Sequence, residues 1–281
     1  MATFRFPSKT FLLGEYAVLK GSNALLLGHA PFFTASVEPA GAPESPFHPE
    51  SPAGKWLAQN PAELRIRFQD PHAGRGGFGG SGAEYLAAWV GERRVPAPDA
   101  PRAIFAWSAW EDSRTVAGVG SGADVLTQAF GVNRDEPFFL EIDLVGRSLR
   151  EIYPRRHQGC LSLFHTGRKL DTHAAAIPDA LPVEEMEDMV LRAGSWLESG
   201  HFEGFAREVN AYAEKLAALG LVAPYTAEAV AAARKLPGVL AAKGCGAMGA
   251  DVILVAHEET ADPFADWATA NSLAEIGRFS V

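Results

Sequence analysis

Residues 70–92, DPHAGRGGFGGSGAEYLAAWVGE, join a cluster of glycines directly to an amphipathic stretch. Tyr85, Leu86 and Trp89 recur at the spacing of one helix face, so this pattern predicts a helix over residues 83–91. A glycine-rich turn that leads into a helix offers backbone N–H groups and the positive end of the helix dipole. Since glycine also lets the backbone approach a ligand closely, the turn favours a bound phosphate.

Two further glycine clusters lie at residues 117–124, AGVGSGAD, and residues 243–251, KGCGAMGAD. A single cluster is equally well explained by a structural turn, but three on one chain favour ligand-binding loops. Residues 77–82 also fit the dinucleotide-binding pattern G-x-G-x-x-G, although the preceding strand-like run, residues 64–68, ends too early for a Rossmann turn. No cluster continues into the G-K-[ST] of a P-loop.

Short strand-like runs separated by turns dominate the first part of the chain, as at residues 4–13 and 32–40. From about residue 175 onward amphipathic helices dominate, and the chain finishes in strand-like runs. This order predicts an α+β fold with two subdomains. We expect an N-terminal domain over residues 1–174, with the first two glycine clusters, and a C-terminal domain over residues 175–281.

The composition excludes several classes of protein. Lys and Arg number 25 against 34 Asp and Glu, a net charge of −9, which argues against binding to nucleic acid or to a membrane surface. The N-terminus, MATFRFPSKTF, lacks the apolar core of a signal peptide, and no apolar run is long enough to span a membrane, so we expect a cytoplasmic protein. Two cysteines, Cys160 and Cys245, are too few for a disulfide scaffold, and no Cys/His spacing predicts a zinc site.

Asp124 and Lys9 are the candidate catalytic residues. Asp124 ends the second glycine cluster, where an aspartate is either the N-cap of the following helix or a carboxylate that orients or deprotonates a substrate hydroxyl. Lys9 lies in a strand-like run, where a lysine usually faces solvent. Beside a carboxylate and phosphates, however, its ammonium would neutralise the charge that develops during group transfer.

Five segments, in order along the chain, resemble the GHMP family of small-molecule kinases, which includes galactokinase, homoserine kinase, mevalonate kinase and phosphomevalonate kinase. The segments and the family patterns they are similar to are Pro7–Leu19 (P-G-K-x-x-L-x-G-E-[HY]-A-V), Gly77–Ala83 (G-L-G-S-S-A-A), Gly120–Asp124 (S-G-x-D), Leu163–Thr172 (V-x-T-G-x-x-x-x-T) and Lys243–Asp251 (K-x-[ST]-G-A-G-G-G-D). One such match would mean little, but five in the family's order make chance a poor explanation.

The resemblance implies a two-part fold, with an N-terminal part like domain 2 of ribosomal protein S5 and a ferredoxin-like C-terminal part. It implies that ATP binds the glycine loop, that Ser81 helps to hold Mg²⁺, and that Asp124 and Lys9 are catalytic. The residues implied to bind ATP are Gly77, Gly79, Gly80, Ser81 and Gly82. Those implied to contact the acceptor are Gly14, Glu15, Tyr16, Ser121, Gly122, Arg168, Gly246 and Ala247.

Details within the motifs favour phosphomevalonate as the acceptor. Tyr16 stands where mevalonate kinases usually have histidine, and residues 117–125 are close to the G-x-G-S-G-x-D-V of phosphomevalonate kinases. Ser113 occupies the position of the glutamate that binds Mg²⁺ in mevalonate kinases. The alternatives are a mevalonate kinase, another enzyme of the family such as diphosphomevalonate decarboxylase, or a protein of this fold that binds a nucleotide or metabolite without catalysis.

Several loop positions depart from the family patterns and motivate the last alternative. Gly80 replaces the first serine of the phosphate loop, Gly82 replaces the first alanine, and the third cluster is broken at Cys245, Met248 and Ala250. The expected partner is a small molecule with an anionic or hydroxyl acceptor group. The candidate basic contacts for an anion are Arg75, Lys20, Arg155, Arg156 and Arg168. One of the amphipathic helices after residue 182 could also serve a homodimer interface.

Overall fold

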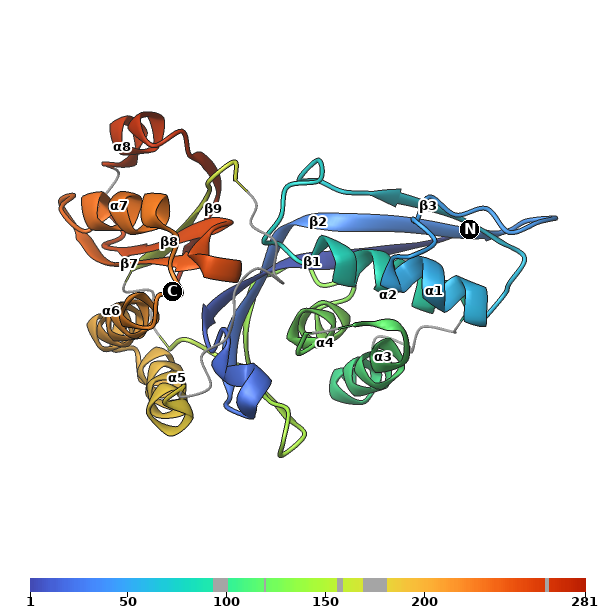
Figure 1. The fold of residues 1–281 in the computed structure, drawn as a ribbon, viewed down its shortest axis with the longest axis horizontal. Helices are drawn as coiled ribbons and strands as arrows, with labels where there is room; N and C mark the ends of the chain where they lie inside the picture. The colour runs from blue at the N-terminus through green and yellow to red at the C-terminus, as the bar shows by residue number, and fades with distance from the viewer. Residues whose placement is uncertain (93–100, 119, 156–158, 169–180, 261–262) are drawn as a thin grey trace. The chain divides into compact units, whose positions relative to one another are not determined.

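A computed structural model describes residues 1–92, 101–118, 120–155, 159–168, 181–260 and 263–281, and it shows a mixture of antiparallel sheets and helices (Figure 1). The elements are β1 (Ala2–Leu13), the 3₁₀ helix η1 (Ala17–Lys20), β2 (Ala24–Pro39), α1 (Pro52–Gln59), β3 (Leu64–Gln69), α2 (Gly80–Glu92), α3 (Arg102–Val116), α4 (Ala123–Phe130), β4 (Phe138–Asp143), β5 (Ser148–Ile152), β6 (Cys160–His165), α5 (Val183–Ser199), α6 (Phe202–Ala218), α7 (Pro224–Ala233), β7 (Val239–Cys245), the 3₁₀ helix η2 (Ala247–Gly249), β8 (Val252–His257), α8 (Phe264–Ala270) and β9 (Ala274–Ser280). The predicted α+β class is confirmed.

The strands form two sheets. In one, β1, β2, β4 and β5 are hydrogen-bonded in that order, and β3 pairs antiparallel with β2, with Thr34 opposite Gln69. In the other, the order is β7, β8, β6, β9, and the neighbouring strands are antiparallel. Among the described residues, no helix combines the length and the apolar character that crossing a membrane requires.

The chain forms two compact units, each assembled from separate stretches of sequence. The first unit comprises Met1–Lys9, Gly28–Gly74 and Phe78–Pro137, and the second comprises Thr10–Leu27, Arg75–Gly77 and Phe138–Val281. Strands β1 and β2 therefore each contribute residues to both units. The domain boundary expected between residues 174 and 175 lies outside the described residues and stays a prediction.

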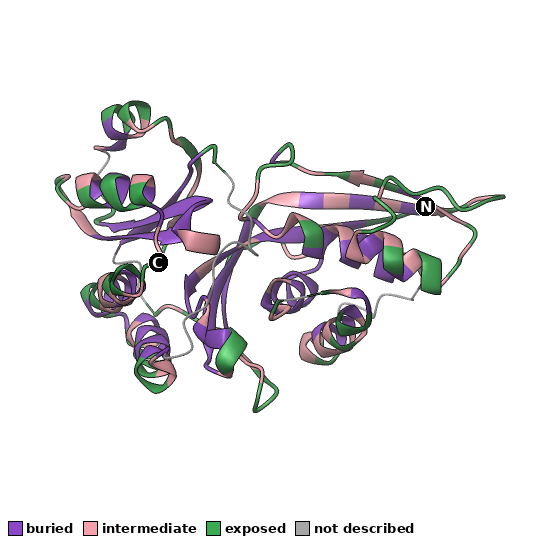
Figure 2. Cartoon of the chain, in the orientation of Figure 1, coloured by how far each residue is buried: buried purple, intermediate pink, exposed green. Residues whose placement is uncertain are grey.

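In the first unit, α2 supplies much of the core. Tyr85, Leu86 and Trp89 are almost completely buried, as their spacing predicted, and α2 packs on β3 and on the helices around it (Figure 2). The Trp89 ring meets Phe105 edge to face at 5.0 Å, and its indole N–H donates to Asp112 at 2.8 Å. The helix begins three residues before the predicted start, because the glycine loop itself forms the first helical turn.

The second unit contains an aromatic core on its four-stranded sheet. Phe164 on β6 packs against Phe264 and Trp267 of α8, and the two centroid distances are 5.5 and 4.9 Å. Val255 and Ile253 on β8 are completely buried in the same cluster. The alternation of these large side chains along short strands places one sheet face in the core.

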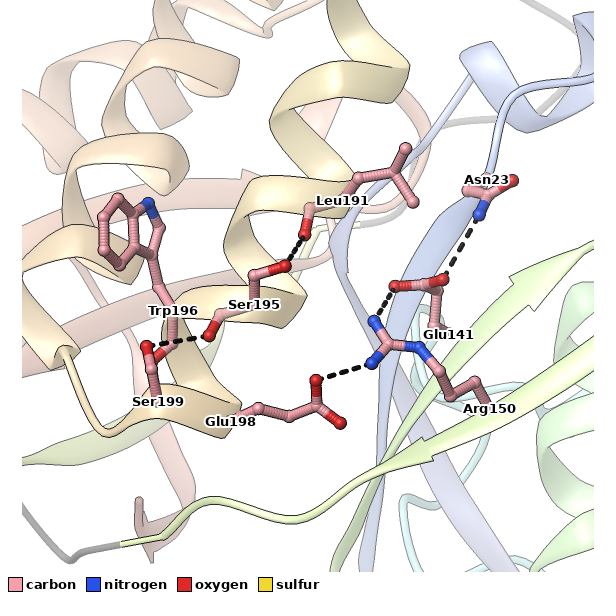
Figure 3. Close-up of polar contacts among 8 residues, drawn as sticks. All are labelled: Asn23, Glu141, Arg150, Leu191, Ser195, Trp196, Glu198 and Ser199. Atoms are coloured by element: carbon pink, nitrogen blue, oxygen red, sulfur yellow. Dashed lines mark hydrogen bonds and ion pairs between the residues drawn. The ribbon is translucent and has the colours of Figure 1, made fainter.

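A buried carboxylate joins the β4–β5 hairpin to α5 within the second unit (Figure 3). The Arg150 guanidinium donates to Glu141 at 2.8 Å and to Glu198 of α5 at 2.6 Å. The side-chain amide of Asn23 donates to the other Glu141 oxygen at 3.3 Å. Glu141 is only 8% exposed, so its charge depends on these donors.

We expect Arg150→Met to lower the free energy of unfolding by about 1–3 kcal/mol, because Glu141 would keep a buried charge without its cation. The matched control is Arg192→Met on α5, since Arg192 pairs with Glu208 while 49% exposed. An exposed pair of this kind contributes about 1 kcal/mol or less. Urea unfolding measures both variants, and equal losses would show that Glu141 is not held as described.

Candidate active site

The predicted site residues fall into two groups, one in each compact unit. The first unit contains Lys9, Gly79, Gly80, Ser81, Gly82, Ser121, Gly122 and Asp124. The second unit contains Gly14, Glu15, Tyr16, Gly77, Arg168, Gly246 and Ala247. The geometry of each group is described in turn.

The glycine loop of the first unit ends in an open helix N-terminus. Gly79 has a φ of +88°, a backbone conformation that glycine adopts without strain. Ala83 N–H donates to Gly79 O at 2.9 Å, the first bond of α2. The N–H groups of Gly80, Ser81 and Gly82 therefore lie in the first turn, where a helix supplies no acceptors of its own. With the exposed Ser81 hydroxyl beside them, these groups can hold an anion.

Lys9 lies directly beside this loop. Its backbone N–H donates to Phe78 O at 3.1 Å, which ties β1 to the loop. The side chain passes Gly79 so closely that a Cβ on that glycine would lie 3.1 Å from Lys9 Cγ. Lys9 is thus next to the glycine loop through both its backbone and its side-chain stem, and its catalytic role stays a prediction.

Asp124 lies in the first turn of α4, and its N-cap interpretation is wrong. The N-cap is Gly122, whose φ of +72° is left-handed. A Cβ on Gly122 would also lie 2.7 Å from the Trp110 ring, so the position has no room for a side chain. The Asp124 carboxylate instead faces the loop, because its Oδ2 lies 3.0 Å from where a Cβ on Gly82 would be.

Ser121 supports the start of α4. Its Oγ accepts a hydrogen bond from Ala123 N–H at 3.2 Å, and its carbonyl oxygen accepts one from the Trp110 indole at 2.8 Å. Both contacts hold the turn that presents Asp124. A contact between Ser121 and an acceptor molecule stays a prediction.

Two buried histidines that sequence reasoning missed support the loop through Phe78. The Phe78 ring stacks on His72 at 4.0 Å and meets His29 edge to face at 6.0 Å. Ser8 Oγ donates to Pro31 O at 2.6 Å and therefore accepts from His72 Nε2, also at 2.6 Å. The one sequence feature that could have indicated these buried contacts is Phe78, a large aromatic residue among the loop glycines.

His29 titrates far below an ordinary histidine. Complete burial lowers the pKa of His29 to about 4, and the hydrogen bond that its Nδ1 donates to Ala30 O offsets this only in part. The ring is therefore neutral in the folded protein at pH 7. Unfolding exposes it to water, where its pKa is about 6.5.

We expect stability to fall as the pH drops from about 6.5 to 4, because the unfolded chain binds a proton at His29 that the folded chain excludes. The loss assigned to His29 is about 3 kcal/mol at pH 4. Urea unfolding across this pH range should show that His29→Phe has a shallower pH dependence than the wild type. The control is the exposed His48→Gln, which should leave the slope as it is. An unchanged slope for His29→Phe would contradict the assignment.

In the second unit, Glu15 forms a buried ion pair. Its carboxylate binds the Lys243 ammonium, and the two side chains are 6% and 1% exposed. Burial opposes the charge on Lys243, but the neighbouring Cys245 and Glu15 outweigh it, so the pKa of Lys243 is raised. The Tyr212 hydroxyl donates to Glu15 O at 2.8 Å. These contacts tie β7 and α6 to the turn at Glu15, and a contact with an acceptor stays a prediction.

Tyr16 joins the same turn to the third glycine cluster. Its hydroxyl oxygen accepts a hydrogen bond from Met248 N–H at 2.6 Å. Gly246, which precedes Ala247, has a φ of +90° and leaves no space for a Cβ, because Asp251 Oδ2 would lie 2.5 Å away. The first and fifth of the family-like segments, more than two hundred residues apart, are thus in direct contact within one unit.

Asp251 also packs against the part of the phosphate loop that belongs to the second unit. Gly77 has a φ of +92°, and a Cβ there would lie 2.6 Å from Asp251 Cβ. Asp251 is 7% exposed and its carbonyl oxygen accepts from Thr166 N–H at 3.0 Å. Two glycine turns therefore share this aspartate as a packing partner.

Two of the candidate basic residues, Arg168 and Arg75, lie near aromatic rings of the second unit. Arg168 is exposed, and its guanidinium lies 4.3 Å from the centre of the Tyr225 ring. Burial and then the positive charge of Arg75 lower the pKa of His165, so Arg75 lies near that ring. Arg156 and residues 169–172 of the fourth motif lie outside the described residues.

The donor set of the first unit fits a magnesium ion that arrives with a nucleotide. Among the described residues, no group of three His, Cys, Asp or Glu side chains could hold a metal by itself. Mg²⁺ bound to nucleotide phosphates needs only one or two protein ligands, which are oxygens. The Ser81 hydroxyl in the first turn of α2 and the half-buried Asp124 carboxylate beside Gly82 are donors of this kind.

No protein-family model matches the chain, and no curated protein matches it in sequence. Solved structures do match it over its length. Phosphomevalonate kinase from Streptococcus pneumoniae, in complex with phosphomevalonate and AMPPNP, has a TM-score of 0.79 at 14% identity and covers 100% of both chains. Mevalonate kinase from Methanococcus jannaschii has a TM-score of 0.73 at 15% identity, over 100% of this chain and 98% of that one. Galactokinase from Lactococcus lactis, complexed with galactose, has a TM-score of 0.72 at 13% identity, over 99% and 95%.

These three proteins are GHMP kinases, and they share their whole fold with this chain. Identities of 13–15% establish the fold alone. The resemblance predicted from five short motifs is therefore confirmed as a resemblance of the entire structure: the chain has the fold of the GHMP kinases.

Proposed function

We propose that the protein is an ATP-dependent small-molecule kinase that phosphorylates phosphomevalonate to diphosphomevalonate. The observation that carries the proposal is that the Asp124 carboxylate of α4 lies beside Gly82. Gly82 belongs to the first turn of α2, whose backbone N–H groups can hold a phosphate. Lys9, on β1, lies against Gly79 of the same loop. A carboxylate, an ammonium and an anion-binding helix N-terminus are the groups that phosphoryl transfer needs.

Each group has a distinct task in this proposal. The N–H groups of residues 80–82 bind the phosphates of ATP and hold them still for in-line attack. The Lys9 ammonium offsets the negative charge that gathers as the γ-phosphoryl group moves. Bound Mg²⁺, held with help from Ser81, would neutralise further phosphate charge.

The task of Asp124 depends on the acceptor. An alcohol must lose its proton during attack, so a carboxylate close to it would act as a general base. A phosphate monoester has a second pKa near 6 and is already largely deprotonated at pH 7. With phosphomevalonate, therefore, Asp124 orients the acceptor and Lys9 rather than removing a proton.

The choice of phosphomevalonate rests on sequence details, because the fold is common to kinases of several substrates. Tyr16 and residues 117–125 follow the phosphomevalonate kinase patterns. A similar structure was solved with phosphomevalonate and AMPPNP together.

An acceptor panel tests the proposal. The purified protein is mixed with ATP, Mg²⁺ and mevalonate, phosphomevalonate, diphosphomevalonate, homoserine or galactose in turn, and ADP release is followed. We expect turnover with phosphomevalonate to exceed that with any other acceptor at least tenfold. Carbon dioxide release from diphosphomevalonate would instead identify a decarboxylase. Nucleotide binding without turnover on any acceptor would identify a non-catalytic protein.

We expect Asp124→Asn to lower kcat by about 10²-fold or more while nucleotide affinity changes less than threefold, because the amide keeps the shape but loses the charge. The matched control is Asp266→Asn, an exposed aspartate in the first turn of α8. Steady-state kinetics with the acceptor from the panel measures kcat, and calorimetry with AMPPNP measures affinity. A kcat near that of the wild type would exclude Asp124 from the reaction.

A further inference from the structure

One buried side chain contacts both the glycine loop and the strand that carries Lys9, and it lies one helical turn from Asp124, although no motif pointed to it. Gln128 lies on α4, one helical turn after Asp124, and is completely buried. Residues four apart on a helix lie on the same face, so both side chains point toward the glycine loop. Gln128 is therefore in a position to connect the loop, the carboxylate and the strand that carries Lys9.

The contacts of Gln128 bear this out. Its amide Nε2 donates to Pro7 O at 3.0 Å, two residues before Lys9 on β1. The same nitrogen would lie 2.9 Å from a Cβ on Gly79. Its Oε1 would lie 2.6 Å from a Cβ on Gly82, the glycine that Asp124 Oδ2 also approaches.

Stability alone does not account for a glutamine at this place. Its Oε1 is buried and accepts no hydrogen bond from any residue that the structure describes, and a buried acceptor in that state is costly. An apolar side chain of similar length would fill the same volume without an unsatisfied Oε1, and would give up only the single bond to Pro7 O. A residue kept in spite of such a cost is a candidate for a role at the site.

Gly82 and Gln128 are complementary in shape. Gly82 lies inside α2, where alanine is the better helix former by intrinsic propensity. An alanine methyl would nevertheless collide with Gln128 Oε1. The family's phosphate loop has alanine at this position. In this chain, glycine at position 82 makes room for the side chain of Gln128.

We propose that Gln128 is a positioning residue that fixes the Asp124 carboxylate and the Lys9 strand against the phosphate loop. The proposal rests on the proposed function for its catalytic consequence. Gln128 contacts the strand through Pro7 O and packs against the loop at Gly79 and Gly82, and the Asp124 carboxylate packs against the same Gly82. Its amide sets the distance between the two helices whose first turns carry the reacting groups.

The first test replaces the amide by an apolar chain of the same length. Gln128→Met keeps the side-chain volume but loses the hydrogen bond to Pro7 O. The glycine loop and the first turn of α4, which carries Asp124, would then no longer be held in a fixed position relative to β1. We expect kcat to fall about 10- to 100-fold, as misplacement of reacting groups by about 1 Å does, while the KM for ATP changes less than threefold. Thr127→Val is the control, because Thr127 is equally buried on α4 but bonds only to Ala123 O of its own helix.

The control separates positioning from folding. Thr127→Val should keep kcat within twofold of the wild type, whatever its melting temperature. Equal kcat for Gln128→Met and the wild type would overturn the proposal. So would losses of kcat that follow the melting temperature equally in both variants, since Gln128 would then be a structural residue only.

The second test uses the complementary pair. Gly82→Ala should weaken AMPPNP binding at least tenfold, because the new methyl displaces the loop from Gln128. Gly82→Ala with Gln128→Ser should recover at least threefold of that loss, because the shorter side chain makes room for the methyl. Gly41→Ala is the control glycine, since a Cβ there meets nothing within 4 Å. If the loss of AMPPNP affinity in the double variant equals the product of the losses in the two single variants, residues 82 and 128 do not interact and the proposal is overturned.

The two proposals fail in different ways. If the wild type binds AMPPNP but phosphorylates no acceptor, the proposed function falls, and the recovery in the double variant still decides whether residues 82 and 128 act together. If the wild type is active and Gln128→Met is as fast, only the role of Gln128 falls. A wild type that neither binds nucleotide nor turns over any acceptor overturns both.

Discussion

Gly79 and Gly82, at the start of α2, leave open the space that neighbouring side chains occupy, and the arrangement of the candidate site depends on that constraint. A Cβ on Gly79 or Gly82 would lie within 3.0 Å of Gln128 and would crowd Lys9 and Asp124. The same turn keeps its backbone N–H groups open at the helix N-terminus. The Asp124 carboxylate can therefore lie next to a helix N-terminus able to hold an anion because glycine occupies positions 79 and 82.

The constraint also gives a physical meaning to departures from the family patterns. The exchange of alanine for glycine at Gly82 is explained by the side chains of Asp124 and Gln128 that occupy its space. Gly80 is different, because a Cβ there would meet only Phe33 at the ordinary distance of 3.8 Å. Nothing in the structure explains why Gly80 replaces serine.

The sequence predicted the fold and the loops better than the contacts between them. The spacing of Tyr85, Leu86 and Trp89 located α2, since one helix face is a local pattern. It could not show that the helix starts at Gly80, because glycines have low helix propensity and only their packing makes them helical. Asp124 had an equally good interpretation as an N-cap until Gly122 was seen to take that place.

Contacts between residues far apart in the sequence left no local signal. Gln128 meets Pro7 across 121 positions, although it is a polar residue inside a segment that looks like an ordinary core helix. Lys243 and Glu15 both stand in motifs, but neither motif indicates that they pair across 228 positions. Their importance comes from what the fold brings opposite them, which periodicity and motif spacing do not record.

The most direct measurement of the central claim is amide hydrogen exchange of the loop with and without AMPPNP and Mg²⁺. The account predicts that the backbone amides of Gly80, Ser81 and Gly82 become strongly protected when the nucleotide binds, because they donate to its phosphates. Nucleotide binding that leaves the exchange of these three amides unchanged would contradict the account.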